Sequence, residues 1–177
     1  MRHGDGQPVS IVQAHGLTIH VDRHEGTVLT GTGPDGKPYE VVQKGDYGFL
    51  PDVNGDDGEG YDVYLGSEPK VERVFVVTQV KASTGKYDEQ KAMLGFRTKG
   101  EAEGHYKAHT HPDMFGRIGA LSLAAFHRQL SEHKESGASV FRAETDEDAE
   151  EMADLTDYEN GPASEPEPPS NPSPEST

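Results

Sequence analysis

The segment Tyr47–Asp62, YGFLPDVNGDDGEGYD, places five carboxylates and four glycines between two short apolar runs. Its glycines permit a tight backbone path, which would let Asp57, Glu59 and Asp62 approach one another. Three like charges in a small volume repel strongly unless a divalent cation neutralises them. The segment therefore has two interpretations: a site for a hard cation beside an anionic substrate, or a surface loop whose Asp, Asn and Gly serve turn formation.

Strand patterns lie on both sides of this segment. Six segments have the alternation or the β-branched and aromatic composition of short strands, namely residues 17–21, 28–30, 39–42, 61–65, 71–80 and 91–96. The turn chemistry of Pro34-Asp35-Gly36 joins the second segment to the third, so we expect the first three to form an antiparallel meander.

Two helices are expected in the second half of the chain. Thr98 and Glu101 have the spacing of a capping box, which predicts a helix that runs to about Ala108. Ser122 begins a second helix, in which Leu123, Phe126 and Leu130 share one face. The expected fold is therefore α+β: a small closed or partly open antiparallel β-barrel, OB-like, of five or six strands with two helices.

Charge is unevenly distributed along the 177 residues. The formal net charge is -16, but the residues from Glu144 onward contain 12 acids and no Lys or Arg. We therefore expect a flexible arm (1–10), one folded domain (11–142) and a disordered, acidic, Pro-rich tail (143–177) suited to tethering or to a basic partner. The acidic balance argues against nucleic-acid binding. The absence of cysteine excludes disulfides, and no apolar run predicts a signal peptide or a membrane span.

Several ordered blocks together resemble a known family. Tyr47-Gly-Phe-Leu-Pro51 followed by Asp57-Gly-Glu-Gly-Tyr-Asp-Val63 resembles the soluble Mg-dependent inorganic pyrophosphatases, in which Y-G-[FY]-[IL]-P leads into D-G-D-x-x-D-V. The blocks 35–38, 73–77, 87–96 and 118–120 resemble a shorter, diverged version of this domain found in phage and mobile-element proteins. The resemblance covers about residues 16–131.

The resemblance implies roles for individual residues. Two or more Mg²⁺ ions, or Mn²⁺, would be bound by Asp57, Glu59, Asp62, Asp88 and Glu89, with Asp57 and Glu59 also assisting proton removal from the attacking water. Pyrophosphate, or a related phosphoanhydride, would be bound by Tyr47, Lys37, Lys91, Tyr106 and Lys107. Glu59 stands where the family has Asp, which lengthens its reach by one methylene.

Two departures from the family pattern concern the grip on phosphate. Leu29 stands where a basic residue is expected, and we expect no Arg at the position before Tyr47 where a phosphate-binding Arg normally lies, which leaves only Lys37 and Lys44 there. Two hypotheses follow: Mg-dependent hydrolysis of pyrophosphate, or a phage virion or particle-associated structural protein that keeps the fold with little activity. Either would be an oligomer without membrane contact, cytoplasmic in a bacterial host or virion-associated, and the tail would be the contact to phage structural proteins.

His105 and His109 have a separate interpretation. They are four residues apart, which is metal-ligand spacing on a continuous helix. No H-E-x-x-H motif accompanies them, and Pro112 follows closely. We therefore expect partly exposed loop histidines rather than a zinc site.

Overall fold

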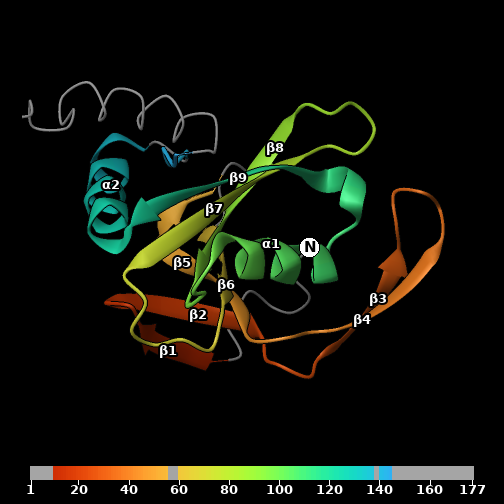
Figure 1. Cartoon of the computed structure of the whole chain (residues 1–177), viewed down its shortest axis with the longest axis horizontal. Helices are drawn as coiled ribbons and strands as arrows, with labels where there is room; N and C mark the ends of the chain where they lie inside the picture. The colour runs from red at the N-terminus through yellow and green to blue at the C-terminus, as the bar shows by residue number, and fades with distance from the viewer. Residues whose placement is uncertain (1–9, 56–59, 138–139, 145–177) are drawn as a thin grey trace, which may run out of the picture. The chain divides into compact units, whose positions relative to one another are not determined.

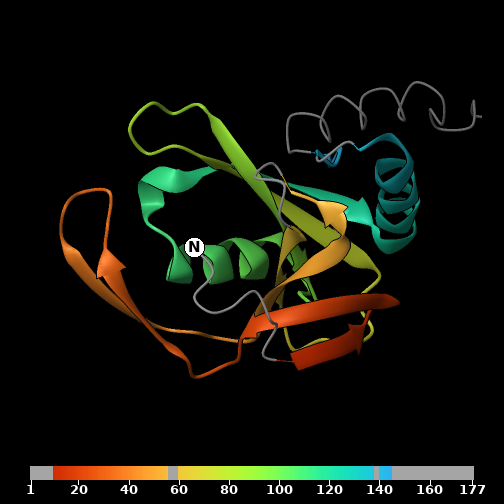
Figure 2. The same cartoon turned by 180° about the vertical axis from the view of Figure 1, so that it is seen from behind.

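The computed structural model describes residues 10–55, 60–137 and 140–144 (Figures 1 and 2). Contacts divide the chain into two units, Met1–Ala143 and Glu144–Thr177, and every element below belongs to the first. The expected flexible arm and acidic tail lie, apart from Ser10, Ala143 and Glu144, outside the described residues. So do Asp57 and Glu59.

The described residues form nine strands, two α-helices and one 3-10 turn. In chain order these are β1 (Ser10–Ala14), β2 (Leu17–Arg23), β3 (Val28–Thr32), β4 (Pro38–Val42), β5 (Tyr47–Asn54), β6 (Gly60–Leu65), β7 (Arg73–Val80), β8 (Tyr87–Leu94), α1 (Lys99–His109), η1 (Pro112–Met114), β9 (Phe115–Ser122) and α2 (Leu123–Ser136). All six predicted strands exist, although the last begins earlier than expected, and β1, β5 and β9 are additional.

Both predicted helices and both of their N-caps are confirmed. The Thr98 hydroxyl accepts a hydrogen bond from the Glu101 amide at 3.1 Å, and the Ser122 hydroxyl accepts one from the Ala125 amide at 3.0 Å. These bonds satisfy amides that the first helical turn leaves without an intrahelical partner. Gly137, with φ of 75°, ends α2 in a left-handed conformation that favours glycine.

The expected barrel is wrong for the described strands. Seven strands hydrogen-bond in the order β1-β2-β5-β6-β8-β7-β9, so the sheet has two ends and is not closed. All neighbours are antiparallel except β6 and β8, which run parallel. The physical reason lies in β7, whose Val74, Phe75, Val76 and Val77 are all buried. Such a run requires cover on both faces of the sheet.

Each face of the sheet has its own hydrophobic core. Val74 and Val76 belong to one cluster with Phe126 of α2, whereas Phe75 belongs to a second cluster with Tyr106 of α1. Alternate side chains of a strand point to opposite faces, so the two helices cover opposite sides. Figure 1 shows α1 and α2 against different parts of the sheet.

The expected meander is also wrong. Among the described strands, β3 and β4 pair only with each other, as a separate two-stranded sheet, while β2 pairs with β5. This hairpin extends away from the main sheet in Figures 1 and 2. Val28 and Val42 pair with each other across this hairpin, and both side chains are exposed. Apolar residues usually indicate a buried strand, so the sequence pattern did not reveal that the hairpin is separate from the main sheet. No helix among the described residues is long and apolar enough to span a bilayer.

Candidate functional site

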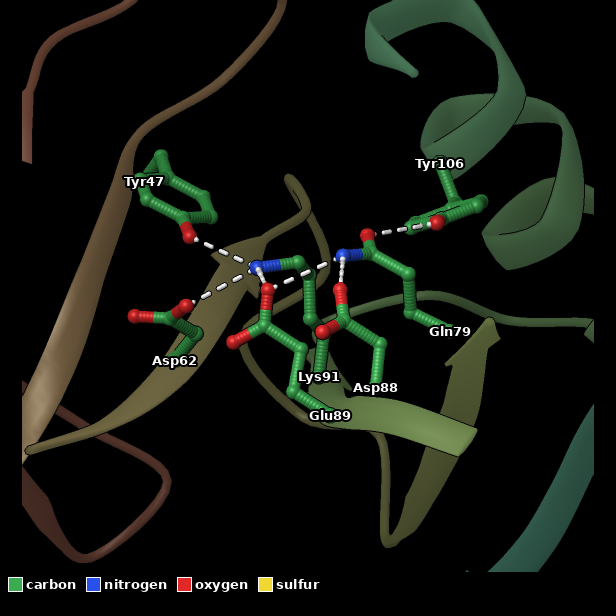
Figure 3. Close-up of polar contacts among 7 residues, drawn as sticks. All are labelled: Tyr47, Asp62, Gln79, Asp88, Glu89, Lys91 and Tyr106. Atoms are coloured by element: carbon green, nitrogen blue, oxygen red, sulfur yellow. Dashed lines mark hydrogen bonds and ion pairs between the residues drawn. The ribbon is translucent and has the colours of Figure 1, made fainter. Parts of the chain in front are cut away.

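The ammonium group of Lys91 is the centre of a buried polar cluster (Figure 3). It donates to Asp62 Oδ2 at 2.8 Å and to the Tyr47 hydroxyl at 3.1 Å, and it lies 3.0 Å from Glu89 Oε1. The Lys91 side chain is only 8% exposed. Its three N–H protons thus have three partners, and the carboxylates compensate a charge that burial would otherwise make costly.

Strand register brings these side chains together. β6 and β8 are parallel with Val63 opposite Ala92, so Asp62 and Lys91 are the preceding pair in this register. Tyr47 lies opposite Tyr64 at the start of β5, and the two rings pack edge-to-face with centroids 4.7 Å apart. The site therefore sits on the face of the sheet that α1 covers, where β5, β6 and β8 meet.

Gln79 extends the cluster toward α1. Its amide nitrogen donates to Asp88 Oδ2 at 2.9 Å and to Glu89 Oε1 at 3.0 Å, while its carbonyl accepts from the Tyr106 hydroxyl at 2.7 Å (Figure 3). The register pairs Gln79 with Glu89 and Val80 with Tyr87, so Asp88 is the extra residue of a β-bulge. The bulge allows two successive carboxylates to reach the same amide.

Burial and charge act in opposite directions on these groups. Desolvation alone would lower the pKa of Lys91, but the combined attraction of Tyr47, Asp62 and Glu89 raises it well above its usual range. Burial raises the pKa of the Tyr47 hydroxyl, and Lys91 offsets only part of that increase. Burial also raises the pKa of Glu89, again against the pull of Lys91. Lys91 is therefore charged, and it is the internal counter-ion of the carboxylates.

Arg23 joins this site although sequence reasoning missed it. Its guanidinium carbon lies 4.1 Å from the centroid of the Tyr47 ring, a cation–π contact. β2 pairs Val21 with Gly48 and Arg23 with Tyr47, so Asp22 is the extra residue of a second bulge. Within the described residues no carboxylate lies at ion-pair distance from Arg23. The expectation that no Arg serves this position is therefore wrong. Arg23 is visible in the sequence, but the bulge that places it opposite Tyr47 has no reliable sequence signal.

The other implied site residues have different environments. Lys37 lies in the turn of the β3–β4 hairpin, where its amide donates to Asp35, and no described contact joins it to the cluster. Lys107 lies on α1, where its ammonium binds Glu103 at 2.7 Å over the ring of Phe115. The structure thus brings Tyr47, Asp62, Asp88, Glu89, Lys91 and Tyr106 into one network.

The carboxylates of the site suit a hard cation. Asp62, Asp88 and Glu89 offer the oxygen donors that Mg²⁺ prefers, and Lys91 already places a positive charge between two of them. Among the described residues, however, no group of three or more His, Cys, Asp or Glu side chains is arranged to hold a metal ion. The donor chemistry fits Mg²⁺, with the implied ligands Asp57 and Glu59 outside the described part.

The two histidines expected in a loop instead lie within α1. The rings of His105 and His109 are 4.6 Å apart, and His105 also packs against Tyr64 and Phe96. His109 Nε2 accepts from the Lys44 amide at 2.9 Å, so it is engaged with protein. Burial, followed by repulsion from His109, lowers the pKa of His105 to about 4. These neutral rings support the Tyr64 side of the site.

Comparison with known proteins agrees with this geometry. The family model described as Inorganic Pyrophosphatase matches residues 8–131. The chain therefore belongs to the inorganic pyrophosphatase family, as the ordered motifs indicated. No curated protein matches the chain. The matched region includes every member of the Lys91 network.

Proposed function

We propose that this protein hydrolyses inorganic pyrophosphate, or a related phosphoanhydride, with Mg²⁺. The observation that supports the proposal most is the Lys91 network, in which family-implied carboxylates surround one buried ammonium beside Tyr47 and Arg23. Asp57, Glu59, Asp62, Asp88 and Glu89 would hold Mg²⁺ or Mn²⁺, which when bound neutralises substrate charge and lowers the pKa of water.

Arg23 is the residue that we assign to the grip on the substrate. Its guanidinium stacks on Tyr47 and has no described carboxylate partner, so its planar N–H donors remain available for a phosphate group. Lys91 differs, because its three protons already contact Asp62, Glu89 and Tyr47. Lys91 would exchange one of these partners before it could contact phosphate, so its first role is to orient and neutralise the carboxylates.

Gln79 and Tyr106 hold the other side of the site. The Tyr106 hydroxyl donates its proton to Gln79, whose amide fixes Asp88 and Glu89. Tyr106 is fully buried, so we assign it to positioning these carboxylates rather than to direct contact with pyrophosphate. This assignment replaces the phosphate-binding role that the family resemblance implied for Tyr106.

Phosphate release from pyrophosphate in the presence of Mg²⁺ tests the proposal. We expect turnover by the wild-type protein and its loss in Asp62→Asn. Arg23→Gln should raise KM roughly 10- to 100-fold, the equivalent of one charged hydrogen-bonding contact. Arg97→Gln is the matched control, since Arg97 is 65% exposed and pairs with Glu68.

The absence of phosphate release by the folded wild-type protein, at any pH with Mg²⁺ or Mn²⁺, would overturn the enzymatic assignment. That result would favour the second hypothesis, in which the fold serves a virion or another particle. An equal KM for Arg23→Gln and Arg97→Gln would leave hydrolysis intact but contradict the role of Arg23.

A further inference from the structure

Two buried glutamines hold the backbone of a short segment that follows α2. Gln90 of β8 donates from Nε2 to the Phe141 carbonyl at 3.0 Å, and its Oε1 accepts from the Phe141 amide at 2.7 Å. Gln129 of α2 binds the backbone of Arg142 in the same way, at 3.0 Å and 2.8 Å. Each side-chain amide thus satisfies both backbone groups of one residue, as a neighbouring β-strand does. Val140–Ala143, which we call the docked segment, is therefore bound between sheet and helix as an extended peptide ligand would be.

The docked segment has one buried anchor, Phe141, which is 2% exposed. Its ring packs against three other rings at centroid distances of 4.7, 4.7 and 4.2 Å, namely those of Tyr61, Phe126 and His133. The residues on either side face solvent, since Val140 is 47% exposed and the Arg142 side chain is 81% exposed. The groove thus selects an aromatic residue and binds the rest through the backbone. Burial of such a ring corresponds to a gain of roughly 10- to 100-fold in a binding constant.

The groove lies directly behind the Lys91 network. Gln90 stands between Glu89 and Lys91 in β8, and Tyr61 precedes Asp62 in β6. Side chains alternate across a strand, so Gln90 and Tyr61 face α2 while their neighbours face the network. The Tyr61 hydroxyl donates to Gln90 Oε1 at 3.2 Å, and the same oxygen accepts from the docked segment. One side-chain amide therefore connects β6, β8 and the docked segment.

The short connection to α2 makes this binding intramolecular. Only residues 137–139 separate Ser136, the last residue of the helix, from Val140. Figures 1 and 2 show the docked segment, in blue, beside α2. A short connection gives an effective concentration on the order of mM. A free peptide of the same sequence therefore competes poorly while Phe141 is in place, and it gains access to the groove once that ring is removed.

We propose that this groove is a recognition site for an extended peptide with one aromatic residue, and that its occupant Val140–Ala143 positions the carboxylates of the Lys91 network from the opposite face of the sheet. Phe141 is then a positioning residue. Without its ring, Gln90 loses its contacts to the segment, and β6 and β8 lose a support for the relative placement of Asp62 and Lys91. The effect on catalysis rests on the proposed pyrophosphate hydrolysis, whereas the binding of a peptide does not.

Fluorescence anisotropy on the full chain tests recognition. The first probe is a fluorescein-labelled peptide with the sequence of residues 138–144, and the second carries Ala in place of Phe. We expect the first probe to bind Phe141→Ala at least tenfold more tightly than it binds the wild-type protein, whose groove is occupied. The second probe should bind Phe141→Ala at least tenfold more weakly than the first. Val28→Ala removes an exposed apolar side chain from β3, so it is the matched control and should behave as the wild-type protein does.

Two further measurements test positioning. In Phe141→Ala the kcat for pyrophosphate should fall at least tenfold while KM stays within about twofold, because Arg23 has no described contact with the groove; the unlabelled peptide should restore at least half of kcat. Amide hydrogen exchange needs no turnover, and the protection of β8 should fall in the variant and return with the peptide. If circular dichroism shows that Phe141→Ala is unfolded, Arg142→Pro replaces it in the same assays, since proline removes the amide that donates to Gln129 and leaves Phe141 in place.

The outcomes separate recognition, positioning and hydrolysis. If both probes bind Phe141→Ala equally, or the first binds it no more tightly than it binds the wild-type protein, the groove does not recognise a peptide and the proposal is wrong. If the peptide binds but neither kcat nor the exchange of β8 responds to it, the docked segment only fills the core and does not position the network. The absence of hydrolysis by the wild-type protein would overturn the proposed function alone, because anisotropy and hydrogen exchange would still decide this proposal.

Discussion

Lys91→Met keeps an unbranched side chain between Asp62 and Glu89 but removes its charge. Two carboxylates then face each other on the buried side of the sheet without their counter-ion. Removing one partner of a buried ion pair costs about 3–5 kcal/mol, because the remaining charge is uncompensated. The Asp62 and Glu89 side chains are 19% and 28% exposed, so water screens part of the repulsion between the two carboxylates. We therefore expect the free energy of unfolding to fall by about 2–4 kcal/mol.

A matched control exists on α1. Lys107 contacts Glu103 at 2.7 Å, which is as short as the Lys91–Asp62 contact, but its side chain is 45% exposed. An exposed pair four residues apart on a helix contributes only about 0.3–0.5 kcal/mol. Lys107→Met therefore tests whether burial, rather than ion-pair distance, determines the loss.

Urea unfolding followed by far-ultraviolet circular dichroism measures both variants, first with EDTA and then with excess Mg²⁺. Mg²⁺ should restore more stability to Lys91→Met than to the wild-type protein, because the unpaired carboxylates then bind the divalent cation more favourably. If the two variants lose the same free energy to within about 0.5 kcal/mol, Lys91 is not a buried counter-ion. If Mg²⁺ raises the free energy of unfolding of Lys91→Met and of the wild-type protein equally, Lys91 and the metal ion do not neutralise the same carboxylates.

Three further predictions test other parts of the fold. The pKa of His105 is lowered to about 4 in the native protein, whereas the unfolded chain protonates near 6.5, so the free energy of unfolding should fall as pH drops between these values. In urea titrations across this pH window, His105→Phe should lose roughly 1–2 kcal/mol less of its free energy of unfolding than the wild-type protein. An equal loss in both proteins would contradict the burial argument. Gln79→Leu removes the amide that joins α1 to β8 and should cost about 1–3 kcal/mol, measured by urea unfolding; a neutral result would show that the network is not stabilising. Gly48→Ala drives a Cβ into the backbone carbonyl of His20 on β2 and should lower the free energy of unfolding by about 1–3 kcal/mol. Gly104→Ala meets no described atom within 4 Å and should raise it by up to about 1 kcal/mol. Thermal unfolding compares the two variants, and the reverse order would refute the packing.

Local signals in the sequence predicted the elements well. The capping residues Thr98 and Ser122 marked both helices, since a side-chain acceptor at an N-cap has a specific geometric consequence. The strand assembly was harder to predict. The sequence Val74–Val77 has no alternation, and it indicated a strand without indicating that helices cover both of its faces. Closure into a barrel depends on long-range pairing, which local patterns do not encode.

The candidate site divides in the same way. The family motifs led to Tyr47, Asp62, Lys91 and Tyr106, which the structure places in one network. Gln79 was missed because a single glutamine within an apolar strand has no motif, although its buried amide needs partners. Lys37 and Lys107 were selected through sequence position, and the structure gives them other surroundings.

The bulge at Asp22 explains how this chain offers a cation at the site despite its departures from the family pattern. With regular pairing after Val21 and Gly48, the residue opposite Tyr47 would be Asp22, a carboxylate that would repel phosphate. The extra residue moves the register by one position and places Arg23 there instead, over the Tyr47 ring. A bulge costs local hydrogen bonding, and it is frequent beside functional sites because it redirects a side chain. Because the bulge places Arg23 rather than Asp22 opposite Tyr47, we expect the site still to attract an anionic substrate.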